Sequence, residues 1–465
     1  MAAPLLTVVG TLSIAALVPC CFRRSGAARS LFRPRASHAA LAATEGGRYI
    51  DSVEEAAKAL CAGRLVAFPT ETVYGLGAHA FDAAAVASIF TTKGRPRSDP
   101  LIVHVPTPAA AESLVRLDAD GLALMRSLMA AFWPGPLTLV APACERLPSA
   151  VTAGSGFVGV RCPKHELALQ LLKAAAIPVA APSANRFGHV SPTRAEHVMD
   201  DLGDHDILVL RQGRAVDDVT DASDGCHVGI ESTVVKVDAD ARELLLLRRG
   251  GVPEAELERW LTSAHVEYGF RVQPTKHTPP PPLDISSSPT AAAAAAAAAA
   301  HAAAESTPEP QMAPGMMLTH YAPDLPSFLV GVASGDGSGA ADLSTTEHTL
   351  SFEVNRSILL DFGGRWEHLR EEALAYRDLS PAANASEAAS SVFEALRWAE
   401  AQSTHGARCV LLPNLAASAG AVIGVEHSAS EHEPALADRL YRAASGREAI
   451  IADCGQKVQV VNVGT

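Results

Sequence analysis

Hydrophobic and polar positions divide the chain into strand-like and helix-like segments between about residue 48 and residue 261. Short runs of aliphatic and β-branched residues predict strands over 65–68, 101–105, 137–140, 157–160, 179–181, 207–210, 232–237 and 244–247. Apolar positions at helical spacing predict helices over 82–90, 121–132 and 166–175. Thr193 followed by Glu196 has capping-box spacing and predicts the start of another helix. The alternation predicts a mixed α/β domain over 45–265.

A second, smaller unit follows a change in composition. From Val272 to Ala313 the chain is rich in Pro, Ser and Ala, so we interpret 266–326 as a linker. The alanine run at 291–300 favours a helix, which leaves the length of the linker open. Beyond it, strands are predicted over 328–332, 358–362 and 409–413, with helices over 382–401 and 433–444. This pattern predicts a Rossmann-like α/β domain with a largely parallel sheet over 327–465.

The first 44 residues have the composition of a targeting segment. No acidic residue precedes Glu45, whereas five arginines lie among Ala and Ser. This composition is typical of a transit peptide, so we expect import into a mitochondrion or plastid and keep the cytoplasm as the alternative. The apolar run from Leu5 to Val18 is shorter than the roughly 20 residues that a membrane span needs, so we expect no membrane partner.

Net charge and cysteine spacing narrow the functional classes. A formal net charge of −13 argues against broad, sequence-independent nucleic-acid binding, which needs a basic surface. None of the eight cysteines forms a C-x-x-C pair, so zinc ribbons and thioredoxin-like chemistry have no support, and we predict no protein-bound metal site.

Several ordered motifs combine cations, hydroxyl groups and glycines at strand ends. Lys93 and Arg95 precede a buried strand, which is a place where proteins bind polyanions. Arg161 ends another strand, where it is either an edge cation or a carboxylate clamp. The motifs are Phe68-Pro-Thr-Glu-Thr-Val-Tyr-Gly-Leu-Gly77, Lys93-Gly-Arg-Pro-Arg-Ser-Asp99, Val158-Gly-Val-Arg161, Ala181-Pro-Ser-Ala-Asn185, Ser191-Pro-Thr193, Gly229-Ile-Glu-Ser-Thr-Val-Val235 and Leu247-Arg-Arg-Gly-Gly251.

Taken in this order, the motifs resemble the threonylcarbamoyl-AMP synthase family with its YrdC-like fold, a twisted mixed sheet, over about 50–262. Pro314-Gly-Met and His320-Tyr-Ala-Pro323 resemble the long two-domain form. The resemblance implies that L-threonine, bicarbonate and ATP, with Mg²⁺ accompanying ATP, give threonylcarbamoyl-AMP and pyrophosphate. The product would pass to a threonylcarbamoyl transferase that modifies the adenosine beside the tRNA anticodon. A weak tRNA contact of this chain is also expected.

The resemblance also implies roles for individual residues. Lys93 and Arg95 are expected to be catalytic. L-threonine is expected to contact Thr72, His104, Arg161, Ala181 and Ser232. ATP is expected to contact Arg95, Asp99, Phe157, Ser183, Asn185, Ser191, Arg248 and Tyr321, the last as part of a lid.

Three positions depart from the family pattern. Asp99 stands where Asn is common, which adds a negative charge near the nucleotide. Phe157 stands where Thr is frequent, so only a backbone contact survives there. Arg249 stands where Pro is usual.

Two other functional classes compete with the synthase. An RNA-binding module would use the concave basic surface that this fold presents, but the overall acidity and the lack of interleaved aromatic and basic residues oppose it. A carbamoyl transferase of the hydrogenase-maturation type would add paired C-x-x-C zinc fingers, and the sequence contains none.

Overall fold

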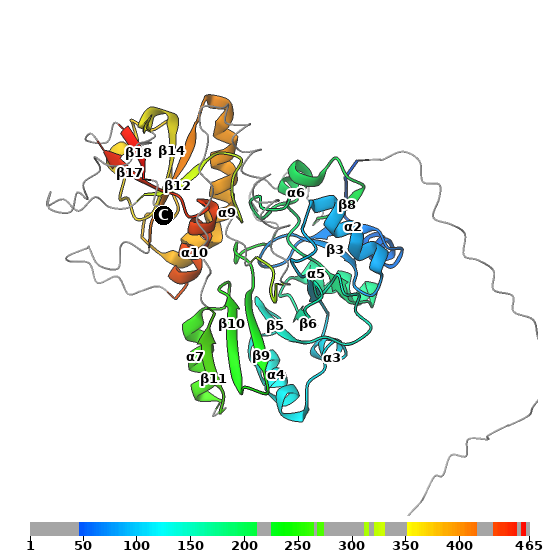
Figure 1. The fold of residues 1–465 in the computed structure, drawn as a ribbon. Coiled ribbons are helices and arrows are strands. Elements are labelled where there is room, and N and C mark those ends of the chain that lie inside the picture. The colour runs from blue at the N-terminus through cyan, green and yellow to red at the C-terminus, as the bar shows by residue number, and fades with distance from the viewer. Residues whose placement is uncertain are drawn as a thin grey trace, which may run out of the picture. The chain divides into compact units, whose positions relative to one another are not determined.

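The computed structural model describes residues 46–211, 225–264, 267–273, 311–315, 320–330, 351–415, 431–452 and 457–461. These residues form two sheets with their covering helices (Figure 1). The predictions for the segment 1–44 and for the alanine run at 291–300 lie outside the described residues.

The first sheet has eleven described strands in the order β1-β8-β2-β3-β7-β4-β6-β5-β9-β10-β11 and is of mixed direction. Its strands are β1 (Arg48–Ile50), β2 (Leu65–Phe68), β3 (Gly75–His79), β4 (Ile102–His104), β5 (Leu137–Pro142), β6 (Phe157–Arg161), β7 (Val179–Ala180), β8 (Ile207–Leu210), β9 (Thr233–Asp238), β10 (Glu243–Arg248) and β11 (Gly269–Val272). All eight strands predicted for this domain are therefore present, as is the mixed α/β class.

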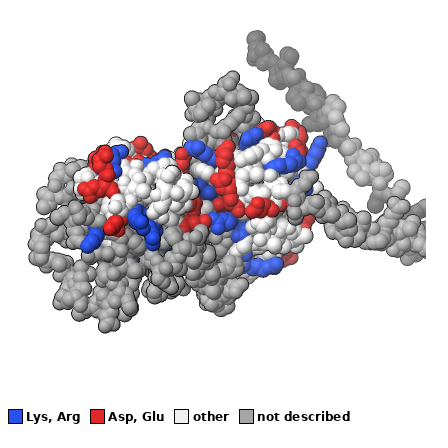
Figure 2. All heavy atoms as spheres, turned by 90° about the horizontal axis from the view of Figure 1, so that it is seen from above, with Lys and Arg blue, Asp and Glu red and all other residues white. Residues whose placement is uncertain are grey.

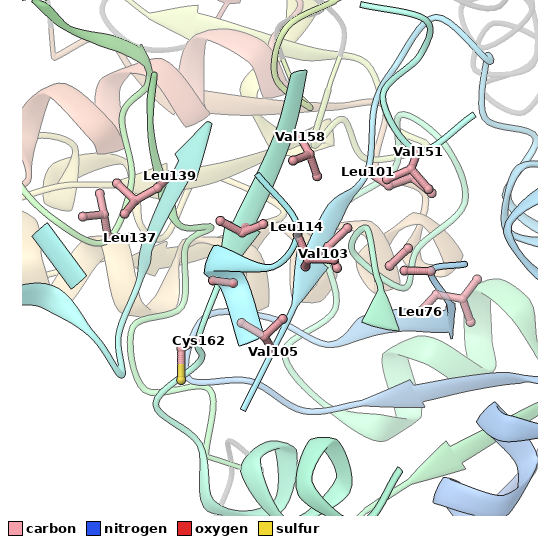
Figure 3. Close-up of a cluster of buried hydrophobic side chains, with 14 of the residues drawn as sticks. Leu76, Leu101, Val103, Val105, Leu114, Leu137, Leu139, Val151, Val158 and Cys162 are labelled. Atoms are coloured by element: carbon pink, nitrogen blue, oxygen red, sulfur yellow. The ribbon is translucent and has the colours of Figure 1, made fainter. Parts of the chain in front are cut away.

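Helices cover both faces of this sheet. They are α1 (Val53–Cys61), α2 (Ala83–Lys93), α3 (Pro108–Glu112), α4 (Ala119–Phe132), α5 (Glu166–Ala175), α6 (Ala195–Leu202) and α7 (Glu254–Ser263). Helices α1 and α5 form one hydrophobic cluster with β2 and β8. Helices α2, α4, α6 and α7 share a larger cluster with the other face, part of which Figure 3 shows. Because side chains alternate along a strand, the same strands supply both clusters.

Several local features differ from the sequence prediction. The helix predicted from Thr193 and Glu196 is present as α6, but the capping box itself does not form: Arg194 is the N-cap and makes no side-chain cap bond, and the buried Thr193 hydroxyl has no hydrogen-bond partner among the described residues. Strands β1, β3 and β11 and helices α1, α3 and α7 were not predicted, and β11 lies inside the range interpreted as linker. The strands are short or contain glycines, so their alternation is weak, whereas α1 and α7 are amphipathic helices that the sequence analysis overlooked.

The second sheet has the order β13-β18-β17-β12-β16-β14-β15. Its strands are β12 (Ser327–Val330), β13 (Ser351–Glu353), β14 (Ser357–Asp361), β15 (Ala375–Asp378), β16 (Cys409–Pro413), β17 (Glu448–Ala452) and β18 (Lys457–Val461). The five strands from β17 to β15 pair in parallel, as predicted, and β13 and β18 pair antiparallel. Helices α9 (Ala385–Ala401) and α10 (Glu433–Ala443) pack on it.

The second α/β domain contacts the first through α9 and α10. Apolar residues of both domains share one cluster, in which Val190 and Ile230 meet Phe393. His189 lies 2.8 Å from Asp201 of α6 and 3.0 Å from Glu400 of α9. Burial lowers the pKa of His189, but its hydrogen bonds to these two carboxylates outweigh that effect and raise the pKa to about 9. His189 is therefore a charged bridge between the two domains at neutral pH.

Charge on the surface is mixed. On the face drawn in Figure 2, the described Lys and Arg side chains alternate with Asp and Glu and form no continuous basic stripe. Within the described ranges, none of the helices has the length and apolar character needed to cross a bilayer.

Candidate active site

The turn between β2 and β3 presents hydroxyl groups to a buried pocket. Thr70 accepts a hydrogen bond from the amide of Val73 (3.2 Å) and donates one to its carbonyl (2.6 Å), which closes the turn. The hydroxyl of Thr72 lies 2.8 Å from that of Thr70. Both threonines are buried and line the pocket.

Arg161, at the end of β6, lies against this turn. It donates to the hydroxyl of Thr72 (3.0 Å) and to the carbonyl of Gly135 (3.3 Å). A terminal nitrogen of Arg161 also lies 2.9 Å from the carboxylate of Glu71, which is equally buried. The sequence left open whether Arg161 is an exposed edge cation; the structure places it inside the pocket wall, 4% exposed.

His104 ends β4 beside Arg161. Burial and then the charge of Arg161 lower the pKa of His104 to about 3, so the ring is neutral. Its Nδ1 atom is buried and has no hydrogen-bond partner among the described residues. Ala181, which follows β7, lines the same pocket.

Arg95 and Asp99 form a buried ion pair after α2. Gly94 ends this helix in the left-handed conformation (φ 63°), which turns the chain toward the pocket. A terminal nitrogen of Arg95 lies 2.9 Å from the Asp99 carboxylate, and the guanidinium also donates to the carbonyls of Asp99 and Pro100. Burial raises the pKa of Asp99, and the charge of Arg95 opposes this. Arg95 lines the pocket, whereas Asp99 stands behind it.

Lys93 supports the loop after β7. Its ammonium group donates to the carbonyls of Ser183 (2.7 Å) and Asn185, so it holds backbone in place. Burial, and then the charge of Arg95, lower the pKa of Lys93 to about 7. Asn185 in turn donates to the carbonyls of Arg186 (2.7 Å) and His189 (2.8 Å). Among these residues, Ser183 is the one that lines the pocket.

Ser232 and Arg248 form the wall next to β9 and β10. The hydroxyl of Ser232 lies 2.8 Å from that of Thr138. Arg248 donates to the carbonyl of Ser232 (2.9 Å) and to its hydroxyl (3.2 Å). Behind Ser232, Ser191 donates its hydroxyl proton to the carboxylate of Glu231 (2.6 Å).

The chain returns to this pocket after the predicted linker. The amide of Gln311 donates to the carbonyl of Ser98 (3.0 Å), and Arg248 donates to the carbonyl of Pro314 (3.2 Å). Pro314, Gly315 and His320 line the pocket. The free volume left is about 50 Å³, whereas ligand pockets commonly measure roughly 300–1,000 Å³. Pro314, Gly315 and His320 therefore cover the pocket and leave little free space for a ligand of that size.

Tyr321 lies beside this closure and is completely buried. Its ring centre lies 4.2 Å from that of His320 and 5.1 Å from that of Phe393 in α9. Its hydroxyl has no hydrogen-bond partner among the described residues. Burial raises the pKa of Tyr321 to about 12, so the phenol keeps its proton and is a donor without an acceptor.

The structure brings most of the predicted residues together. Those that line the pocket are Thr72, Arg95, His104, Arg161, Ala181, Ser183, Ser232 and Arg248. Lys93, Asp99 and Asn185 contact pocket residues or their loops from behind, and Ser191 reaches the pocket through Glu231. Phe157 does not line it: its ring packs with Met312 and lies 4.7 Å from the Lys236 ammonium.

Residue-level reasoning missed several contributors, among them Glu71, Glu231, His320 and Arg439. Glu71 and Glu231 lie inside motifs that the sequence analysis singled out, and His320 belongs to the returning motif. Their positions next to residues that were assigned to the site could have identified them. Arg439 of α10, which contacts Glu231, belongs to an ordinary amphipathic helix and carried no signal at all.

Comparisons with known proteins bear on this site. A family model described as "Telomere recombination" matches residues 58–250. A second one, described as "Threonylcarbamoyl-AMP synthase, C-terminal domain", matches residues 285–445. A putative threonylcarbamoyl-AMP synthase of Mycobacterium tuberculosis is 42% identical over 161 residues, which is 35% of this chain and 72% of that protein. The chain belongs to the threonylcarbamoyl-AMP synthase family.

Two further matches extend the relationship within this family. The threonylcarbamoyl-AMP synthase of Pyrococcus abyssi is 42% identical over 217 residues, so the match spans 46% of this chain and about three fifths (59%) of that relative. A crystal structure of P. abyssi Sua5 in complex with L-threonine superposes with a TM-score of 0.61 at 29% identity. It covers 87% of this chain and 99% of that one. The YrdC-like fold and the two-domain architecture predicted from the sequence are thus confirmed.

Proposed function

We propose that this chain is an L-threonylcarbamoyladenylate synthase, a nucleotidyltransferase that converts L-threonine, bicarbonate and ATP into threonylcarbamoyl-AMP and pyrophosphate. The observation that carries the proposal is the charge of the pocket. Three buried arginines, Arg95, Arg161 and Arg248, line it, and Glu231 is the one acidic residue among the described lining residues. Such a wall favours ligands with several negative charges, such as a carboxylate together with phosphates.

Threonine fits the part of the pocket around Arg161. A carboxylate there would accept from the guanidinium, which is already held by Thr72 and Gly135. The neutral ring of His104 and the hydroxyl of Ser232 supply uncharged polar groups for the hydroxyl and amine of the substrate. The P. abyssi relative was solved with this amino acid, which supports the assignment.

The chemistry needs positioning and charge neutralisation more than a dedicated base. Bicarbonate loses water to give CO₂, and the threonine amine adds to its carbon and releases a proton to form a carbamate. A carbamate oxygen then attacks the α-phosphorus of ATP, and pyrophosphate leaves with the electron pair of the broken P–O bond. Arg95 and Arg248 are placed to stabilise the charge on the phosphates. Closure by Pro314, Gly315 and His320 would keep water away from the carbamate and the acyl adenylate.

Mg²⁺ would reach this pocket with the nucleotide. The nearby carboxylates among the described residues, Glu71, Asp99 and Glu231, are paired with Arg161, Arg95 and Arg439, so none is a free ligand for a metal. Phosphate oxygens are the natural partners of Mg²⁺, which keeps several water ligands. The ion would neutralise the phosphates and help pyrophosphate to leave.

The alternative of an RNA-binding module finds less support. The arginines of the site are less than a tenth exposed, so they are inaccessible to a polynucleotide backbone, and charge on the face in Figure 2 is mixed. A contact with tRNA and transfer of the product to a threonylcarbamoyl transferase stay parts of the proposal.

Mass spectrometry of the full chain incubated with threonine, bicarbonate and ATP tests the proposal. Threonylcarbamoyl-AMP and pyrophosphate are expected in equal amounts, and both should require threonine. ATP hydrolysis that is independent of threonine, with no adenylate formed, would overturn it.

A further inference from the structure

The second α/β domain places one of its own arginines beside the pocket. Arg439 of α10 is completely buried, and its Nε atom donates to the carboxylate of Glu231 (3.1 Å). Its Nη2 atom donates to the carbonyl of Arg249 (2.8 Å). Its guanidinium carbon lies 5.4 Å from the centre of the Tyr321 ring. One side chain thus contacts two loops of the first domain and the segment that returns from the linker.

The two loops that Arg439 joins form a single wall. A β-carbon at Gly250 would lie 2.3 Å from the carbonyl oxygen of Glu231, so the backbones of the two loops are in direct contact. The amide of Gly251 donates to that same carbonyl (3.0 Å). Ser232 and Arg248, which line the pocket, are the next residues along these loops. A displacement of Glu231 or of the carbonyl of Arg249 would therefore also move the pocket-lining residues Ser232 and Arg248.

Glu231 fixes the orientation of a hydroxyl at this wall. One carboxylate oxygen accepts the proton of Ser191 and the other accepts from Arg439. A carboxylate is an acceptor only, so Ser191 donates its single proton to Glu231 and offers lone pairs to a ligand. Without Arg439 the buried carboxylate would lose its cationic partner, and the direction of this proton would no longer be fixed.

We infer that Arg439 is a positioning residue for the nucleotide: through Glu231 it orients the hydroxyl of Ser191, and through its guanidinium face it holds the ring of Tyr321 beside the pocket. This inference rests on the proposed function, because it assigns the nucleotide to the side of the pocket that Glu231 and Arg248 line, with Ser191 behind Glu231 and Tyr321 beside His320. It makes the second domain a part of the active site. The nucleotide-binding part of the pocket therefore needs the second domain in addition to the linker segment that carries Tyr321.

The alternative is that Arg439 only docks the two domains, and the chain offers a matched control for that. Arg194 and Glu394 also form an ion pair between the domains, from the start of α6 to α9, and neither lines the pocket. Glu394→Gln removes that pair, whose side chains are about a third exposed, without touching Glu231 or Tyr321. A docking role predicts that neither variant discriminates between ATP and threonine, whereas a positioning role predicts a selective loss of ATP affinity in Arg439→Met.

The experiment measures ATP and threonine binding separately, by calorimetry, for full-length wild type, Arg439→Met, Arg439→Lys and Glu394→Gln. Arg439→Met should weaken ATP binding at least about tenfold, because a buried charge loses its partner. Its threonine affinity should fall much less, because Arg161, Thr72 and His104 make no contact with Arg439. Both affinities of Glu394→Gln should stay within about twofold of wild type, the range for sites with no shared partner. Arg439→Lys keeps the charge but loses the planar fork, so it should recover only part of the ATP affinity.

A double variant tests the route through the serine. If Arg439 acts through Glu231 and Ser191, Ser191→Ala should cost less ATP affinity in the Arg439→Met background than in wild type, because residues of one network are not additive. Full additivity, or wild-type ATP affinity of Arg439→Met, would overturn the inference. Failure of the wild-type protein to form the adenylate would instead overturn the proposed function, so the two failures are distinguishable.

Discussion

Variants of the ion pair between Arg161 and Glu71 can separate the contribution of Arg161 to stability from its role in threonine binding. Both side chains are nearly inaccessible, at 5% and 1% exposure, and they lie 2.9 Å apart. Arg161→Ala leaves the Glu71 carboxylate buried without its cation, which costs about 3–5 kcal/mol of unfolding free energy. At about 2–4 °C for each kcal/mol in a domain of this size, the Tm should fall by roughly 6–20 °C.

The double variant Arg161→Met with Glu71→Gln should reverse most of that loss. It removes both charges and retains the approximate volume of both side chains, and such replacements are often neutral for stability. Threonine binding should nevertheless stay weak, by roughly 30-fold or more, because the partner of the carboxylate is absent. Arg126→Met is the control: this arginine pairs with Glu112 at the surface, 57% exposed, where an ion pair contributes about 0–1 kcal/mol.

Thermal unfolding and calorimetric titration with threonine check both parts. A double variant that binds threonine as tightly as wild type would refute the carboxylate clamp. An Arg161→Ala variant with the Tm of wild type would show instead that Glu71 does not depend on this cation.

Four further outcomes are expected. Arg95→Ala should weaken ATP binding roughly 30-fold or more with threonine binding largely retained, as measured by calorimetry, and equal losses would contradict the assignment. Tyr321→Phe removes a buried hydroxyl that has no described partner, so urea unfolding should show equal or higher stability while titration shows weaker ATP binding; unchanged ATP affinity would exclude the contact. The pKa of His189 is raised from 6.5 to about 9, so the contribution of His189 to the unfolding free energy is complete below pH 6.5 and is lost as the pH rises through 9. Urea titrations at different pH values should show this dependence, and Glu400→Gln should make it weaker. A fluorescent fusion of residues 1–44 should localise to a mitochondrion or plastid, and diffuse cytosolic fluorescence would contradict the transit peptide.

The sequence predicted the strands of the first domain well because their aliphatic runs are long and end in glycines or polar motifs. β2 and β8 begin and end at the predicted residues. It missed β3, in which Gly75 and Gly77 lie within a strand paired with β2. β-Carbons at these glycines would meet Ala181, Phe68 and Val179, so close packing explains why glycine stands at both positions.

The same limit applies to the site. Motif order brought most of the pocket residues together, because each motif follows a strand of the same sheet. The partners of those residues could not be predicted. Whether Arg161 is paired with Glu71, and whether Arg439 reaches Glu231 from about 200 positions away, depends on tertiary packing that no local pattern encodes. Lys93 illustrates the point, because it was expected near phosphates and is bound to two backbone carbonyls.

The contact at Gly250 has a consequence for interpreting natural variation in this protein. Gly250 touches no proposed ligand and carries no side chain, so a change there to alanine looks conservative by chemistry and remote by function. Yet an added methyl group would overlap backbone atoms of residues 231–233 at 2.3–2.5 Å, where no side-chain rotation gives relief. The two loops would have to separate, and Ser232 and Arg248 would move apart with them. A Gly250→Ala variant would therefore lose activity as a variant of an active-site residue does, although Gly250 makes no contact with the substrate.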